Sequence, residues 1–220
     1  MAAANSLVDL RKLLAERFPQ RTAAAATLLS SGVAALDEIS GGGLPKSAIT
    51  ELVSPNTSAG SASLIHALLQ NAEQNNQFVA LIDGRDSFDP GSFTNSFLRH
   101  LLWVRCQKAF DAIKAADLLL RDGNFPLVIV DLVLNPPEEL RKIPQTSWYR
   151  LQRLVETVPT TCLVLTRQSI VSSAQLKLVL ETRWTLAALE DENAIARLRF
   201  RVQRSHLKSA ISNQQPAIRS

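Results

Sequence analysis

The chain has 220 residues, of which 46% are hydrophobic and 20% charged, and its formal net charge is +4. This length and composition favour a single domain with a full core and exclude wholesale disorder. Two cysteines without a CxxC pair, together with only three histidines, argue against a disulfide scaffold and against a structural zinc site.

The N-terminal region, residues 1–27, is expected to hold an amphipathic helix and a linker. Leucines recur at helical spacing over residues 6–18, and the Ala- and Thr-rich stretch 20–28 shows no clear period. Charged residues stand where a signal peptide would need its apolar centre. No apolar run approaches the roughly 20 residues of a membrane helix, so we expect a soluble, cytoplasmic protein.

Residues 28–204 are expected to form the core domain, in which strands and helices alternate. The predicted strands, in chain order, are Ala48–Val53, Phe78–Asp83, Trp103–Arg105, Leu127–Asp131 and Cys162–Thr166. The predicted helices follow the turn Ser54–Ser61 up to about Gln74, and cover Phe93–Leu102, Lys108–Arg121 and residues 147–156. The run LVIVD is almost wholly apolar, which suits a strand buried on both faces of a sheet.

Beyond residue 166 this alternation ends, and a hairpin is expected. Arg183–Leu189 and Ala196–Gln203 have the pattern of two strands paired around the turn EDEN. In the second strand, Leu198, Phe200 and Val202 would share the face that is turned to the core. The sequence therefore predicts an α/β fold: a mostly parallel, twisted sheet flanked by helices, with antiparallel strands at one edge.

The loop after the first of these strands has the position of a phosphate cradle. In such a cradle, backbone amides and a helix N-terminus hold phosphate, a lysine reaches the terminal phosphates, and a Ser or Thr holds magnesium. Here the pattern GxxxxGK[ST] is absent, and no Lys or Arg occurs between Lys46 and Arg85. The loop is either a structural turn that caps a helix or a vestigial phosphate loop. The candidate residues of a vestigial site are Ser54, Pro55, Asn56, Thr57, Ser58, Ala59, Gly60 and Ser61, with Asp131 and Asp89.

Four blocks, in order, resemble the core of the RecA recombinase family. Ser31–Asp37 and then Gly42–Pro45 resemble the family's T-G-x-x-x-L-D turn and the G-G-L-P segment before its phosphate loop. Phe88–Pro90 is similar to the segment whose Asp-Pro pair lies close to adenine. The third block is Ala109–Arg121 with LVIVD, and it puts Asp131 in the Walker B place. The fourth block, CLVLT with Leu176–Trp184, resembles the following strand and the return of the chain into an edge hairpin. The resemblance implies a RecA-like, P-loop NTPase-type core.

Three positions depart from the family's pattern. Gly60 stands where the family has the phosphate-loop lysine, Arg85 where it has the water-activating Glu, and about Arg167 where it has the Gln that senses the γ-phosphate. Hydrolysis of a phosphoanhydride depends on positioning and on neutralising the charge that develops. We therefore expect no enzyme activity and no cofactor, although ATP with magnesium remains open. The nine residues 167–175 are also too few for a long loop that wraps a DNA strand.

A RecA-like core that is short, has degenerate loops and ends in basic residues resembles the ImuA type. That resemblance implies a non-catalytic adaptor of the bacterial DNA damage response, which supports error-prone translesion synthesis. The implied partners are a Y-family polymerase-like protein of the ImuB type and an error-prone replicative-type polymerase, with RecA and single-stranded DNA as further candidates and no membrane. Two alternatives are a DNA-dependent ATPase of repair or recombination with an atypical phosphate loop, and a SulA-like inhibitor of cell division.

The charge is concentrated at the C-terminal end. Residues 197–220 contain six basic residues and no acid, whereas the preceding residues contain 18 basic and 20 acidic residues. Such a segment can bind nucleic acid or an acidic protein surface, or it can be a solubilising terminus. We expect residues 205–220 to be a basic tail that is ordered only on a partner. The candidate partner- or DNA-binding residues are Arg197, Arg199, Arg201, Arg204 and Lys208.

Three other patterns favour structural roles. Asp83, Asp86 and Asp89 are spaced three apart, which does not match a calcium loop, so a role in capping and turns is the better interpretation. Ser61 and His66 lie in no GxSxG elbow, which leaves no nucleophile motif. The three tryptophans stand singly beside apolar runs, as packing residues do. No metal site is expected.

Overall fold

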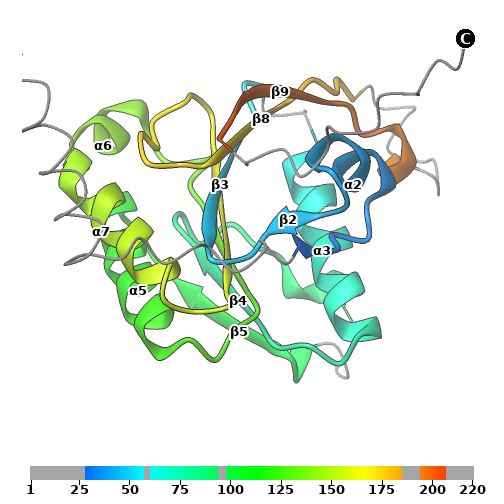
Figure 1. Cartoon of the computed structure of the whole chain (residues 1–220), viewed down its shortest axis with the longest axis horizontal. Helices are drawn as coiled ribbons and strands as arrows, with labels where there is room; N and C mark the ends of the chain where they lie inside the picture. Colours follow the sequence, from blue (N-terminus) through cyan, green and yellow to red (C-terminus); the bar gives the residue numbers. More distant parts are fainter. Residues whose placement is uncertain (1–27, 57–59, 94–97, 185–193, 207–220) are drawn as a thin grey trace, which may run out of the picture.

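The computed structural model describes residues 28–56, 60–93, 98–184 and 194–206. The helix predicted over residues 6–18 and the predicted tail beyond residue 206 lie outside these ranges. The described residues form one α/β unit around a central sheet, drawn in Figure 1. None of the described helices is long and apolar enough to cross a membrane.

The central sheet has seven strands in the order β5-β4-β6-β7-β3-β8-β9, which confirms the predicted fold class. Its strands are β3 (Ala48–Val53), β4 (Val79–Asp83), β5 (Leu101–Arg105), β6 (Leu127–Asp131), β7 (Thr161–Thr166), β8 (Leu176–Leu180) and β9 (Phe200–Ser205). Neighbouring strands pair in parallel, except that β9 runs antiparallel to β8 at one edge. A second, two-stranded sheet pairs β1 (Leu28–Leu29) with β2 (Leu44–Pro45).

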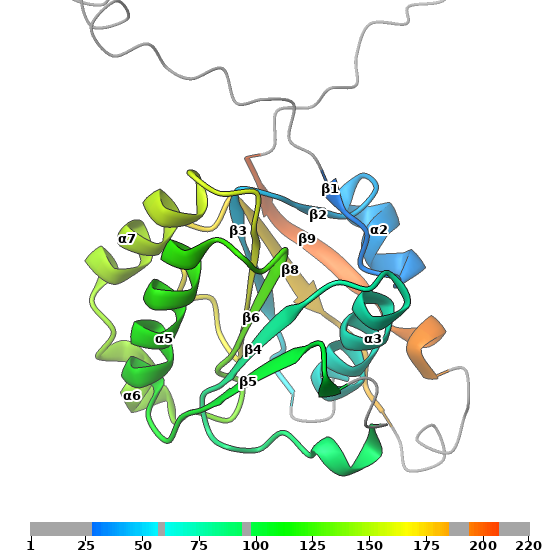
Figure 2. The same cartoon turned by 90° about the horizontal axis from the view of Figure 1, so that it is seen from below.

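Helices cover both faces of the central sheet, as Figure 2 shows. One face carries α2 (Ala34–Ser40) and α3 (Ser61–Gln74), and the other carries α5 (Ala109–Asp122), α6 (Pro137–Arg141) and α7 (Gln145–Val155). Two short 3-10 helices, η1 (Pro90–Ser92) and η2 (Ala194–Arg197), lie in the connections. This arrangement is the predicted mostly parallel sheet flanked by helices.

The apolar strands divide their side chains between two cores because successive side chains of a strand point to opposite faces. In β6, Leu127 and Ile129 join the core beneath α2 and α3, whereas Val128 and Val130 join the core beneath α5 and α7. The run is apolar throughout because both of its faces are covered. β6 pairs in parallel with β7, which places Asp131 beside Leu165.

The antiparallel edge pair does not lie where the predicted hairpin places it. Its first strand is β8, and residues 181–184 are not a strand, while the rest of the predicted strand Arg183–Leu189 and the turn EDEN lie outside the described residues. β9 begins at Phe200, so the buried Leu198 precedes the strand, and Val202 is 38% exposed rather than turned to the core. The apolar sequence pattern of β8 is interrupted by Lys177, a buried lysine. The pairing of β8 with β9 is also irregular between Lys177 and Leu178.

Two helical predictions also need correction. The helix predicted over Phe93–Leu102 overruns β5, because Leu101 and Leu102 pair with β4. The short helix α6 was not predicted, because the two consecutive prolines at its start, Pro136 and Pro137, are typical of a loop. Proline is tolerated in the first turn of a helix because the amide there needs no intrahelical partner.

Candidate functional site

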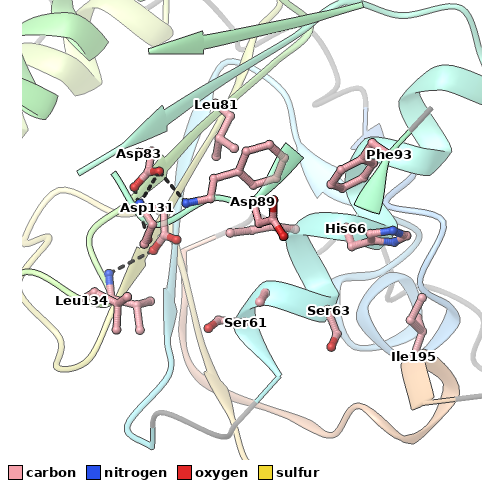
Figure 3. Close-up of a pocket in the computed structure, with 15 residues that line it drawn as sticks. Ser61, Ser63, His66, Leu81, Asp83, Asp89, Phe93, Asp131, Leu134 and Ile195 are labelled. Carbon is pink, nitrogen blue, oxygen red and sulfur yellow. Dashed lines mark hydrogen bonds between the residues drawn. The ribbon is translucent and has the colours of Figure 1, made fainter. Parts of the chain in front are cut away.

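A cavity of about 520 Å³ opens where β4 and β6 end and α3 begins. Strand pairing puts the last residues of β4 and β6, Asp83 and Asp131, side by side. Ser61 and His66 reach the cavity from α3, and Asp89 reaches it from the loop after β4. Figure 3 shows these side chains around one space. The site thus lies at the carboxyl ends of parallel strands, where ligands of open α/β sheets bind.

The Asp83 carboxylate organises the loop that follows β4. It is 2% exposed and accepts hydrogen bonds from the amides of Ser87 and Phe88, both at 2.7 Å, and from the amide of Arg85 at 3.2 Å. These donors compensate a buried negative charge. The interpretation of this aspartate as a capping and turn residue agrees with these bonds, and no group of acidic, histidine or cysteine residues in the described ranges is arranged to hold a metal ion.

Asp131 has a different environment. Its carboxylate accepts a hydrogen bond from the Val133 amide at 3.0 Å and borders the cavity. Burial, with a smaller contribution from the charge of Asp83, raises the pKa of Asp131 to about 6. A half-buried carboxylate that has no cation beside it among the described residues is expected to behave in this way, because desolvation disfavours the charged form.

Aromatic rings form one wall of the cavity. His66 stacks on Phe93 with ring centroids 4.5 Å apart, and Phe93 lies 5.4 Å from Phe88. Burial lowers the pKa of His66, because desolvation favours the neutral imidazole. Phe88 in turn makes an edge contact with Trp103 of β5, which helps to hold the Phe88 ring in place. The sequence analysis did not identify this wall, because its rings come from three separate segments.

Gly60, which precedes α3, is covered by the C-terminal part of the chain. Its φ of 91° lies in the left-handed region that favours glycine. A β-carbon at this position would meet the indole nitrogen of Trp184, and it would lie 2.8 Å from Leu198 Cδ2. The backbone position that resembles the family's loop lysine therefore has no room for a side chain as the structure stands.

The structure gathers part of the predicted vestigial site. Ser61, Asp89 and Asp131 line the cavity, whereas Ser54 is buried and its hydroxyl donates to the carbonyl of Asn56. Residues 57–59 lie outside the described ranges, and Pro55 is exposed. Among the described residues that line the cavity there is no lysine or arginine.

Two positions compared with the family's catalytic residues lie away from the cavity lining. The Arg85 guanidinium donates to the carbonyl of Gln107 at 3.0 Å and lies 3.7 Å from a carboxylate oxygen of Glu139. It borders a separate hollow with Asp86 and Gln107. Arg167 is exposed on the loop after β7. Neither residue is among those that border the cavity.

The loop after β7 is held by a buried ion pair that sequence reasoning missed. Lys177 lies 2.6 Å from the carboxylate of Glu51, and both side chains are largely buried. Glu51 also accepts hydrogen bonds from the amides of Ile170 and Val171, at 2.6 and 2.9 Å. Residues of two strands, β3 and β8, thus fix the loop after β7. No sequence motif marks such a pair.

The predicted partner-binding arginines have different surroundings. Arg197 and Arg199 are exposed, and Arg201 pairs with Glu181 at 2.6 Å. Arg204 donates to two backbone carbonyls, those of Ser172 at 2.9 Å and Ala174 at 2.7 Å. That guanidinium therefore ties β9 to the loop before β8. Lys208 lies outside the described ranges.

Comparison with known proteins places the chain in a family. A family model described as the RecA N-terminal domain matches residues 15–147. The protein RecA of Chlorobaculum tepidum is 30% identical over 119 residues, which are 51% of this chain and 34% of that protein. RecA of Chlamydia felis is 32% identical over 117 residues, 51% of this chain and 33% of that protein. The matched part is therefore about a third of the length of these relatives. Because the family model covers more than half of the chain, the chain belongs to the RecA N-terminal domain family.

Proposed function

We propose that this chain is a non-catalytic RecA-like adaptor of the bacterial DNA damage response, which supports error-prone translesion synthesis through protein partners. Membership of the RecA family supports a role in DNA repair or recombination. The observation that carries the non-catalytic part is Gly60, which stands in place of the loop lysine and is packed beneath Trp184 and Leu198.

The charges around the cavity support the same proposal. A nucleoside triphosphate needs cations around its phosphates, and the transfer of a phosphoryl group depends on neutralising developing negative charge. Asp83, Asp89 and Asp131 border the cavity, and its described lining contains no lysine or arginine. Such an arrangement of carboxylates repels a polyanion unless magnesium intervenes.

We infer the partners from the ImuA resemblance and from the basic C-terminal segment. The proposed partners are a Y-family polymerase-like protein and an error-prone replicative-type polymerase, with RecA and single-stranded DNA as further candidates. Arg197 and Arg199 are exposed beside the end of the sheet, where a partner can reach them. Arg201 and Arg204 lie on the same segment and also make contacts within the chain.

The test is an assay of ATP binding and hydrolysis by the full chain, with and without single-stranded DNA. A RecA protein with an intact phosphate loop is the positive control. We expect no saturable binding and no turnover above that of a buffer blank. DNA-stimulated turnover that is abolished by Asp131→Ala would overturn the proposal and favour the repair ATPase.

The adaptor role itself is tested by co-purification of the full chain with a Y-family polymerase-like protein of the same bacterium. An Arg197→Ala/Arg199→Ala double variant tests the contact surface, and Lys114→Ala/Arg121→Ala on α5 is the matched control, with the same loss of charge. We expect the first variant to weaken the complex and the second to leave it intact. Failure of the unaltered chain to bind either polymerase would contradict the adaptor role.

A further inference from the structure

We propose that the cavity at the end of β4 and β6 holds the guanidinium group of an arginine side chain that a protein partner presents. The inference rests on the proposed function, because it requires the cavity to be free of nucleotide. Its residues are Asp131, Asp89, Phe88, Phe93 and His66, which border one space of about 520 Å³. Figure 3 shows Asp131 on the left, Phe93 and His66 on the right, and Asp89 between them.

The charges of the cavity call for a cation. Among the described residues, Asp131 accepts one hydrogen bond, from the Val133 amide, and has no basic side chain beside it. Asp83, next to it, is already satisfied by loop amides. Burial lowers the pKa of His66, which disfavours a positive charge on its imidazole. A half-buried carboxylate such as that of Asp131 is stabilised when a cationic donor enters and bonds to it.

The rings indicate an organic cation rather than a metal ion. Phe88 and Phe93 present aromatic surface, which attracts a cation through the negative face of the ring. The described residues contain no cluster of acidic, histidine or cysteine side chains that is arranged as metal ligands. A metal ion would also gain nothing from the apolar side chains of Leu81 and Val133 that share the cavity.

Among organic cations, the geometry favours guanidinium over ammonium. A guanidinium is planar, so it stacks on rings, and its paired donors match the two oxygens of a carboxylate. Its aliphatic stem can lie along apolar side chains such as Leu134, which is 50% exposed at the rim. The cavity volume lies within the roughly 300–1,000 Å³ of ligand sites, so residues beside the arginine can enter as well.

The experiment is a methyl NMR titration of the full chain with two short peptides. One is acetyl-Ala-Arg-Ala-amide, and the other has citrulline, a neutral isostere, in place of arginine. We expect the arginine peptide to shift lining methyl groups in the millimolar range, as suits one side chain, and the citrulline peptide to shift none. The reporting residues are Ala62, Ile65, Leu81, Val133, Leu134 and Ile195.

Variants distinguish binding of the arginine peptide at this cavity from a general attraction of the peptide to acidic side chains. Asp131→Asn keeps the shape and is expected to weaken the arginine peptide about tenfold, the loss of one charged hydrogen bond. Phe93→Leu should weaken it less, and Asp122→Asn, an exposed aspartate at the end of α5, should leave it unchanged. Methyl signals of the second core, around Val128 and Val164, report whether each variant is folded.

Three outcomes overturn the inference. Equal responses to the arginine and citrulline peptides would remove the role of charge, and shifts outside the lining, or none up to tens of millimolar, would remove the site. An ATP titration of the same sample keeps this failure distinct from failure of the proposed function. If ATP shifts the lining methyl groups, the proposed function fails as well; if both ATP and arginine are silent, only the arginine site fails.

Discussion

Two residues of the candidate site, Gly60 and Asp131, have surroundings that differ from those a nucleotide site needs. At Gly60 the departure is steric, because a β-carbon would meet Trp184 and Leu198. At Asp131 it is electrostatic, because burial raises the pKa to about 6 and no cation compensates the carboxylate within the described lining. Each departure can be measured as a change in stability, without any assay of function.

Replacing Gly60 by alanine should destabilise the protein through both strain and overpacking. We expect Gly60→Ala to lower the free energy of unfolding by roughly 2–4 kcal/mol in urea denaturation. Gly41→Ala is the matched control, because Gly41 also has a positive φ, of 79°, but a β-carbon there meets nothing within 4 Å. The control should lose about 1 kcal/mol. Equal losses at both positions would mean that Trp184 and Leu198 do not confine Gly60.

Asp131→Asn should stabilise the protein at neutral pH and not in acid. The folded-state pKa is raised from 3.8 to about 6, so the stability that the protonated carboxyl contributes is complete below about pH 4 and is lost as pH rises through 6. At pH 7.5 we expect the variant to gain up to about 3 kcal/mol over the unaltered chain, since one pKa unit corresponds to about 1.4 kcal/mol. The gain is measured by denaturation at pH 4 and pH 7.5, and a gain of equal size at both pH values would contradict the assignment.

At the scale of elements, the edge pair of β8 and β9 closes the sheet on the side of the loop after β7. The ion pair of Lys177 with Glu51 holds that loop from within. Arg204 holds it from β9, through the carbonyls of Ser172 and Ala174. The strand that sequence analysis treated as a basic binding surface is therefore also a structural element.

Arg204→Ala should cost stability where Arg201→Ala does not. The half-buried guanidinium of Arg204 donates to two carbonyls, and hydrogen bonds from charged donors contribute about 1.5–3 kcal/mol. Arg201 makes an exposed ion pair with Glu181, which is worth about 0–1 kcal/mol. Thermal melting of the two variants compares them directly. If Arg201→Ala proves the more damaging, the assignment of Arg204 to the fold is wrong.

At the scale of the whole molecule, sequence patterns identified strands that are buried on both faces, most clearly β6, whose apolar run LVIVD is hard to place elsewhere. β3 and β6 have the predicted bounds. β8 was misplaced because its Lys177 is buried by a partner 126 positions away in the sequence. In the site, Ser61, Asp89 and Asp131 were predicted from motif positions. The aromatic wall and the cover over Gly60 were not, because they depend on contacts between distant segments.

The contacts of the last described residues lead to a prediction of where the folded unit ends. The His206 amide still donates to the carbonyl of Gln175, and β9 ends at Ser205. A chain that stops after His206 should therefore melt at the same temperature as the full chain, whereas a chain that stops after Arg199 loses β9 and should melt many degrees lower.

The chain that stops after His206 also tests whether the basic tail binds a partner. If Lys208 and Arg219 help to bind single-stranded DNA, the full chain should bind it more tightly than the chain ending at His206, and the difference should shrink as salt rises, because each neutralised phosphate releases counterions. If a protein partner is bound through Leu207, Ile211 and Ile218 instead, removal of the tail should weaken that complex at every salt concentration. Fluorescence anisotropy with a labelled oligonucleotide, beside co-purification with the polymerase-like protein, separates the two. Unchanged binding of both partners by the shortened chain would leave residues 207–220 with no role in recognition.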